Sequence, residues 1–224
     1  MEVKMKKNII SFLLSGVLVM SLVSCTNKAD KKVEEPKTKT QVEEKKIEGE
    51  WAKNYSKEEV TKYNNEILTK IEELTQIFEL EYEKKEVVKE ENGETVNSNY
   101  IYVDNLNPEP NRLESMDYRF KIYGSDMSKG QLVLRIGFNL DKKTIKEDGS
   151  FDFKETSIAS YSEAMTGVED RDYTELNKQI YDIVNSDKSE GTIENNLNGL
   201  LETISIKDNI LLYKLETKKY DFKK

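Results

Sequence analysis

The sequence predicts an α+β fold, in which a long N-terminal helix packs on an antiparallel sheet, with two shorter helices and a final strand near the C-terminus. Three observations lead to this prediction. Apolar residues recur at helical spacing over residues 60–78, the period then falls to two over residues 112–140, and helical spacing returns over residues 173–204. Strands grouped between helices, without regular alternation of the two, favour α+β over α/β.

The first helix has a clear start signal. Ser56 and Glu59 have the spacing of a capping box, and Tyr55 and Val60 occupy the two positions of a hydrophobic staple. We expect the apolar face of this helix to lie across a sheet. A coiled-coil partner is disfavoured because Lys70 interrupts a strict heptad. The apolar face consists of Val60, Tyr63, Ile67, Leu68, Ile71, Leu74, Ile77 and Phe78.

The region after Phe78 reads as strands. Asn92-Gly93 is the strongest short signal for a β-hairpin, although the segment before it, "LEYEKKEVVKEE", could also prolong the helix. The segments "RLESMDYRFKIYG" (112–124) and "QLVLRIGFNL" (131–140) alternate apolar and polar residues, which is typical of half-buried antiparallel strands. Asp148-Gly149 predicts a further hairpin turn.

Two helices and a strand are expected in the remainder. Asp172 and Glu175 have capping-box spacing ahead of an apolar stripe that ends at Val184. The segment "TIENNLNGLLETI" (192–204) repeats this helical pattern, and "NILLYKLETKKYDF" (209–222) is expected to be the final strand.

The first residues indicate a targeting signal. Three lysines in "MEVKMKKN" precede an uncharged run over residues 9–23, as in a secretory signal peptide. The run contains Ser and Gly and is shorter than the roughly 18 apolar residues of a spanning helix. Translation could start at Met1 or at Met5, since either start leaves a complete signal.

The only cysteine follows this run directly. The residues Leu22-Val23-Ser24-Cys25 resemble the lipobox of bacterial lipoproteins. The resemblance implies cleavage between Ser24 and Cys25 and attachment of diacylglycerol to the Cys25 sulfur, with acyl chains such as palmitate holding the protein at the outer side of the cell membrane. An ordinary signal peptide with a coincidental cysteine is the alternative. A buried core cysteine is disfavoured by the strongly polar residues that follow.

These features divide the chain into a signal peptide (1–24), a lipidated cysteine with a charged, disordered tether (25–54) and a single folded domain (55–224). Removal of residues 1–24 leaves 32 basic and 42 acidic residues, a net charge of −10. This negative charge argues against nucleic acid or an anionic bilayer surface as a partner.

The composition excludes several kinds of active site. The chain has no histidine, which rules out Ser-His-Asp and Cys-His systems and the usual zinc sites. The Gly-rich fingerprints of nucleotide binding are also missing from the sequence. A calcium loop around Asp148 and Gly149, with Asp152 and Glu155, fails because Thr144 and Lys146 occupy positions of acidic ligands. We therefore assign no catalytic residue, metal ligand or cofactor.

Carboxylates and tyrosines remain as candidates. Glu169, Asp170 and Asp172 surround Arg171 at the start of a predicted helix, where the helix dipole favours acidic side chains in any case. Paired carboxylates could hydrolyse a glycosidic bond if they faced one another in a cleft. Four tyrosines could form an exposed platform for sugar or peptide, or pack at the sheet margin: Tyr100, Tyr102, Tyr118 and Tyr123.

The sequence thus predicts a membrane-anchored cell-envelope lipoprotein with an extracytoplasmic binding or interaction domain. The ligand could be an envelope protein, a peptide or a glycan. Two alternatives stay open: a carboxylate-dependent hydrolase of envelope glycans, and a structural or regulatory partner of another envelope protein.

Overall fold

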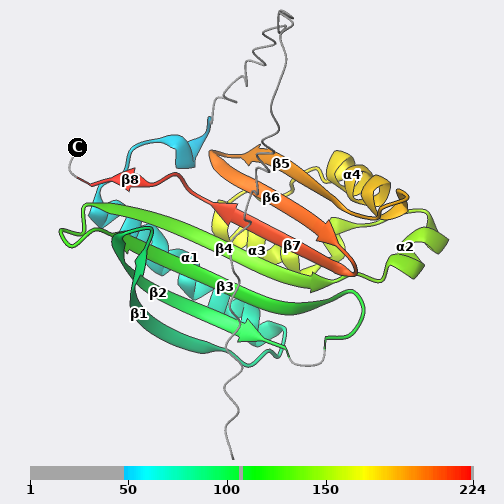
Figure 1. Ribbon diagram of the computed structural model, residues 1–224, viewed down its shortest axis with the longest axis horizontal. Helices are drawn as coiled ribbons and strands as arrows, with labels where there is room; N and C mark the ends of the chain where they lie inside the picture. The colour runs from blue at the N-terminus through cyan, green and yellow to red at the C-terminus, as the bar shows by residue number, and fades with distance from the viewer. Residues whose placement is uncertain (1–47, 106–107, 223–224) are drawn as a thin grey trace, which may run out of the picture. The chain divides into compact units, whose positions relative to one another are not determined.

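A computed structural model describes residues 48–105 and 108–222. Their main feature is an antiparallel sheet with the strand order β1-β2-β3-β4-β7-β6-β5, in which the short β8 pairs with β4 (Figure 1). The strands are β1 (Glu83–Glu91), β2 (Glu94–Asp104), β3 (Arg112–Tyr123), β4 (Lys129–Asn139), β5 (Gly191–Leu197), β6 (Leu200–Lys207), β7 (Ile210–Glu216) and β8 (Tyr220–Asp221). The α-helices are α1 (Lys57–Ile77), α2 (Lys142–Asp148), α3 (Ser157–Thr166) and α4 (Thr174–Asn185).

The predicted fold class is wrong. An eight-stranded antiparallel sheet dominates the described residues, which are mostly β and carry four α-helices. The largest local error is the segment 192–204, which forms the hairpin β5–β6 and not a helix. Asn198 and Gly199 make its turn with φ of 53° and 90°, because Asn and Gly tolerate the left-handed region that such turns require.

A second local error concerns Asp148-Gly149, which makes no hairpin turn. Asp148 ends helix α2, and Gly149 caps it with a left-handed φ of 69°. Glycine is the usual residue after a helix for this reason, so the same dipeptide serves a helix end as well as a turn. Helices α2 and α3 are both additional to the two short helices that we expected.

The hairpin at Asn92-Gly93 is formed as predicted, and it decides the state of the preceding segment. Asn92 and Gly93 have φ of 54° and 76°, and strands β1 and β2 pair in register on either side of them. Residues 83–91 are therefore a strand and do not prolong α1, which starts at the Ser56–Glu59 capping box and ends at Ile77.

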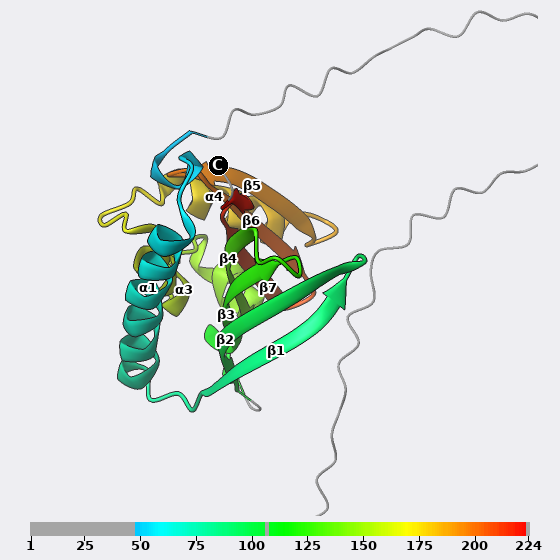
Figure 2. The same cartoon turned by 90° about the vertical axis from the view of Figure 1, so that its left-hand side faces the viewer.

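The two faces of the sheet differ. Helices α1 and α3 lie on one face, and the core between helices and sheet includes Ile71, Leu134 and Tyr161 (Figures 1 and 2). The opposite face, which we call the open face, has no helix over it in either view. Its side chains alternate along each strand with those of the helix-covered face: Lys85 from β1, Tyr100 and Tyr102 from β2, Asp117, Arg119 and Lys121 from β3, Val133 and Arg135 from β4, and Leu212, Lys214 and Glu216 from β7. Of these, Lys121 and Val133 are buried.

The folded part begins before residue 55. Glu50–Ala52 form a short 3-10 helix, and Trp51 within it is only 8% exposed. The Trp51 backbone N–H donates to the carbonyl of Asn198 at 3.0 Å, and its indole Nε1 donates to the carbonyl of Thr166 at 3.3 Å. Trp51 is therefore a packing anchor, and the last residues assigned to the tether belong to the domain.

Candidate functional site

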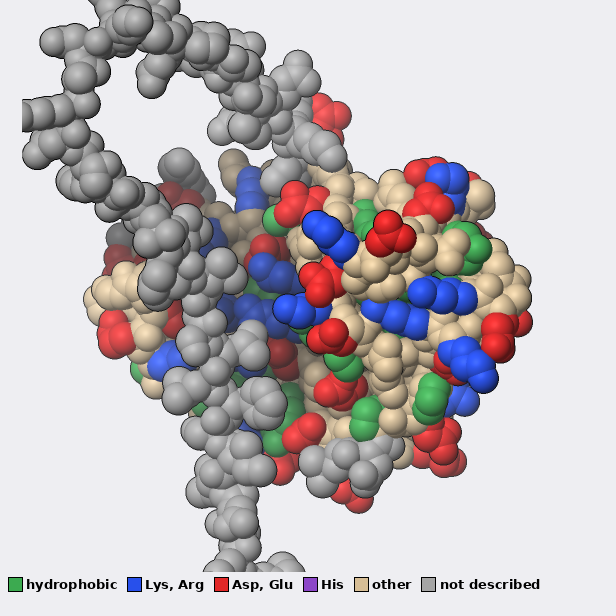
Figure 3. All heavy atoms as spheres, turned by 45° about the vertical axis from the view of Figure 1, so that its right-hand side comes forward, with side chains coloured by type: hydrophobic (Ala, Val, Ile, Leu, Met, Phe, Trp, Pro, Cys, Tyr) green, Lys and Arg blue, Asp and Glu red, His purple; other side chains and the backbone are tan. Residues whose placement is uncertain are grey.

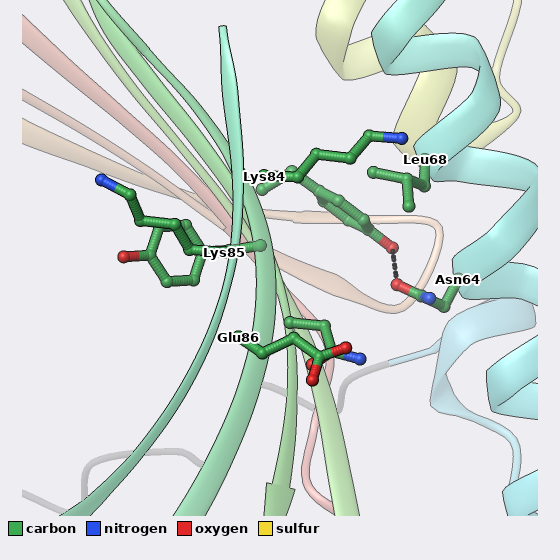
Figure 4. A pocket seen from close by; sticks show the side chains of 8 residues that line it. Asn64, Leu68, Lys84, Lys85 and Glu86 are labelled. Carbon is green, nitrogen blue, oxygen red and sulfur yellow. Dashed lines mark hydrogen bonds between the residues drawn. The ribbon is translucent and has the colours of Figure 1, made fainter.

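A pocket of about 230 Å³ opens between helix α1 and the first three strands (Figure 4). It is lined by Asn64, Leu68, Lys84, Lys85, Glu86, Asn99, Tyr100 and Tyr118. Helix α1 presents every third or fourth side chain to one side, and strand β1 presents every second one. These two spacings bring the residues together at the pocket. The pocket is smaller than the roughly 300–1,000 Å³ of sites for drug-sized ligands.

The floor of the pocket is a buried hydrogen bond. The Tyr118 hydroxyl donates to Asn64 Oδ1 at 3.2 Å (Figure 4). The Asn64 amide in turn donates to Asn65 Oδ1. Burial raises the pKa of Tyr118 well above its ordinary value, so the hydroxyl stays protonated at neutral pH. It is therefore a fixed hydrogen-bonding group and not a nucleophile.

Charged side chains from β1 stand at the pocket. Lys84 points toward α1, where its Nζ lies 2.5 Å from Glu72 Oε1, whereas Lys85 points to the other side of the strand (Figure 4). Glu86 shares the α1 side of the strand with Lys84 and has no ion-pair or hydrogen-bond partner among the described residues. The pocket thus offers an unpaired carboxylate, an amide-hydroxyl floor and the apolar Leu68.

This arrangement suits the binding of a small polar molecule. A hydroxyl or amine group of a ligand can bond to Glu86 and Asn99, and a carbon face can rest on Leu68. Glycoside hydrolysis needs two facing carboxyl groups, and Glu86 is the only carboxylate among the residues that line this pocket.

The acidic cluster expected at Arg171 does not form a site. Glu169, Asp170 and Asp172 are exposed, and Arg171 turns away from them to make two hydrogen bonds of 2.6 and 2.8 Å with Glu202. Glu202 is fully buried, and sequence reasoning missed it because residues 192–204 were read as a helix. The available signal was a charge at an inward position of an alternating strand, between Leu200 and Ile204.

The four tyrosines do not share one surface. Tyr100 and Tyr102 lie side by side on the open face with ring centroids 6.3 Å apart, whereas Tyr118 points into the core side of the sheet. Tyr123 is buried near the end of β3, where its hydroxyl donates to Gln131 Oε1 at 2.8 Å. The sequence-predicted platform is thus reduced to one pair of half-buried rings.

The proposed lipidation and cleavage residues, Cys25 and Ser24, lie outside the described residues. Over residues 48–105 and 108–222, no helix has the length and apolar character needed to cross a membrane, and no group of three acidic or cysteine side chains could hold a metal ion. Comparison of the chain with models of protein families, with curated protein sequences and with solved structures finds no match.

Proposed function

We propose that this protein is a lipid-anchored binding protein of the bacterial cell envelope, whose folded domain captures a small polar ligand in the pocket between α1 and β1. The observation that carries the location is Cys25, the only cysteine of the chain, directly after Leu22-Val23-Ser24 at the end of an apolar run. Two or more acyl chains on this residue give stable membrane attachment, whereas one chain binds only marginally.

The pocket supports a binding role. Beside the charged side chains of β1, its lining includes three uncharged polar groups from three different elements, the Tyr118 hydroxyl and the amides of Asn64 and Asn99. Uncharged donors and acceptors fix a ligand by geometry, and the single carboxylate of Glu86 adds a preference for a hydroxyl or an amine.

The anchor is tested by replacing Cys25 with serine in the bacterial host. We expect the wild-type chain in the membrane fraction, with an intact mass that includes diacylglycerol on Cys25 and lacks residues 1–24. The Cys25→Ser chain should carry no lipid, because a hydroxyl is a far weaker nucleophile than a thiolate. A wild-type protein that is recovered unmodified from the soluble fraction would contradict the proposed anchor.

The ligand is tested by thermal unfolding of the mature chain in a neutral detergent, with amino acids, dipeptides, monosaccharides and disaccharides. A ligand at 100 times its Kd should add about 2.7 kcal/mol to the free energy of unfolding, or roughly 5–10 °C in Tm. Leu68→Trp fills the pocket and should abolish the shift. Ile77→Trp is the matched control, because Ile77 lies on the same helix and is 71% exposed.

Two outcomes would overturn this assignment. A shift that persists undiminished in Leu68→Trp would place the ligand elsewhere. Turnover of an envelope glycan that is lost in Glu86→Gln would show the hydrolase that the sequence left open.

A further inference from the structure

The open face brings several cations together on a protein whose net charge is negative. Cross-strand pairing places Arg135 of β4 between Asp117 of β3 and Lys214 of β7, and it places Arg119 of β3 beside Tyr100 of β2. Lys and Arg side chains gather in a hollow of this side of the molecule (Figure 3). Four of these cations are paired with carboxylates, namely Lys85 with Glu83, Arg119 with Asp117, Lys121 with Glu91 and Lys214 with Glu216, which leaves Arg135 as the unpaired charge of the face among the described residues.

Arg119 is held in a fixed orientation. Its Nε donates to Asp117 Oδ2, and its guanidinium lies over the Tyr100 ring at 4.8 Å from the centroid. Neither of its outer nitrogens, Nη1 and Nη2, has a hydrogen-bond partner among the described residues. A guanidinium that is fixed through Nε and by an aromatic ring can still donate from Nη1 and Nη2 to a carboxylate or phosphate.

Arg135 is an unpaired cation. It is exposed, and no hydrogen bond, ion pair or ring contact joins it to any described residue. Its cross-strand neighbour Lys214 is paired with Glu216 at 2.6 Å, so Asp117 and Glu216 are both already engaged. Arg135 therefore faces solvent with its full charge uncompensated by hydrogen bonds.

A neighbouring lysine reports the same positive field. Burial lowers the pKa of Lys121, the ion pair with Glu91 opposes this, and the charges of Arg135 and Arg119 lower the pKa further. The two guanidinium groups are thus close enough to disfavour a third positive charge between the strands.

We propose that the open face binds a linear anionic glycan, with carboxylate or phosphate groups held by Arg119 and Arg135. This inference rests on the proposed binding role of the domain and adds a second, extended surface to it. Lys85 and Arg119 share one cross-strand row, and Arg135 and Lys214 share the next row, two residues along the strands. A polymer with regularly spaced anionic groups can contact Arg119 in one row and Arg135 in the next.

The chemistry of the face favours a glycan over an acidic peptide. Extended peptides gain their main hydrogen bonds at a sheet edge, through the backbone, whereas the middle of a face offers side chains only. The face also presents the half-buried rings of Tyr100 and Tyr102 and the exposed Leu212, whose apolar surfaces suit the carbon faces of sugar rings.

The test is binding of the mature chain, in a neutral detergent, to fluorescently labelled polygalacturonate, measured by anisotropy. Phosphomannan supplies phosphodiester groups, dextran is the uncharged control, and poly-glutamate represents an acidic peptide. We expect Arg135→Glu to weaken binding to the anionic glycans at least about tenfold, and Arg119→Ala combined with Arg135→Ala to weaken it about 100-fold. Raising the ionic strength to about 0.15 M should weaken binding by the wild-type chain.

The matched control is Arg112→Ala, which removes the same charge from an exposed arginine at the start of β3. It should leave binding unchanged within about twofold. Arg135→Gln removes the charge without placing a carboxylate opposite Asp117, so it should keep the wild-type Tm and still weaken binding, which excludes misfolding as the cause of a loss. The relative affinity for polygalacturonate and phosphomannan identifies the anionic group.

Three results would overturn the inference: no binding of either anionic glycan at low ionic strength, equal losses in Arg112→Ala and Arg135→Glu, or tighter binding of poly-glutamate than of both glycans. Failure here is distinguishable from failure of the proposed function. The Leu68→Trp variant blocks the pocket and leaves the open face intact, so a small-ligand shift that disappears in Leu68→Trp supports the pocket whatever the polymers do.

Discussion

Replacing Arg171 with leucine should lower the free energy of unfolding by about 3–5 kcal/mol, because it leaves the buried Glu202 without its counter-charge. Glu202 accepts two hydrogen bonds from the Arg171 guanidinium and one of 2.9 Å from the Asn195 amide. Its Oε1 also lies 2.8 Å from the Tyr213 hydroxyl. A carboxylate so placed is stable only while its cationic partner is present.

Urea unfolding followed by circular dichroism measures this loss. At roughly 2–4 °C per kcal/mol, the corresponding decrease in Tm is about 6–20 °C. The control is Lys178→Leu, which breaks the exposed pair with Asp182 and should change the free energy of unfolding by less than about 0.5 kcal/mol. Similar losses in the two variants would show that the buried pair contributes no more than a surface pair.

The pH dependence of stability should also distinguish the wild-type protein from Arg171→Leu. Burial alone would raise the pKa of Glu202, but Arg171 and the hydrogen bonds from Asn195 and Tyr213 outweigh it and lower the pKa below its ordinary value. In the wild-type protein, the contribution of Glu202 to the free energy of unfolding is therefore present above pH 4.5. This contribution is lost as the pH falls through the lowered pKa of Glu202. In Arg171→Leu burial dominates and raises the pKa, so the difference between the two proteins should shrink between about pH 7 and pH 4.

Replacing Trp51 with alanine should cost about 3–5 kcal/mol, the usual range for a buried Trp. Its ring packs edge-on against Tyr63 at 5.4 Å and Tyr55 at 6.4 Å between centroids. The indole also ties the segment before α1 to the carbonyl of Thr166, at the end of α3. The variant therefore loses both packing and the attachment of residues 48–54 to the domain.

Circular dichroism is the appropriate readout, because Trp51 is the only tryptophan and its fluorescence disappears with it. Ile77→Ala serves as the control, since Ile77 is 71% exposed and its truncation should change stability by less than about 0.5 kcal/mol. If Trp51→Ala unfolds at the wild-type urea concentration, the segment before α1 is not part of the cooperative unit.

Local rules account for the features that the sequence determined by itself. The Asn92-Gly93 turn follows from backbone conformations that these two residues adopt at low cost. The strand at 131–140 follows from the recurrence of an apolar residue at every second position, and Leu132, Leu134, Ile136, Phe138 and Leu140 are all buried. The lipobox-like residues before Cys25 likewise form a continuous local motif, whose implied lipid anchor remains a prediction.

Tertiary structure decided the rest. Residues 192–204 satisfy a helical pattern and an alternating one, and pairing of β6 with β7 selects the strand because it buries Leu200, Ile204 and Ile206 together. The same pairing buries Glu202, whose counter-charge is Arg171, a residue of the loop before α4 that is distant in the sequence. The pocket and the open face also depend on strand register, which aligns Lys84 of β1 with Tyr118 of β3 and places Arg135 of β4 opposite Asp117 of β3.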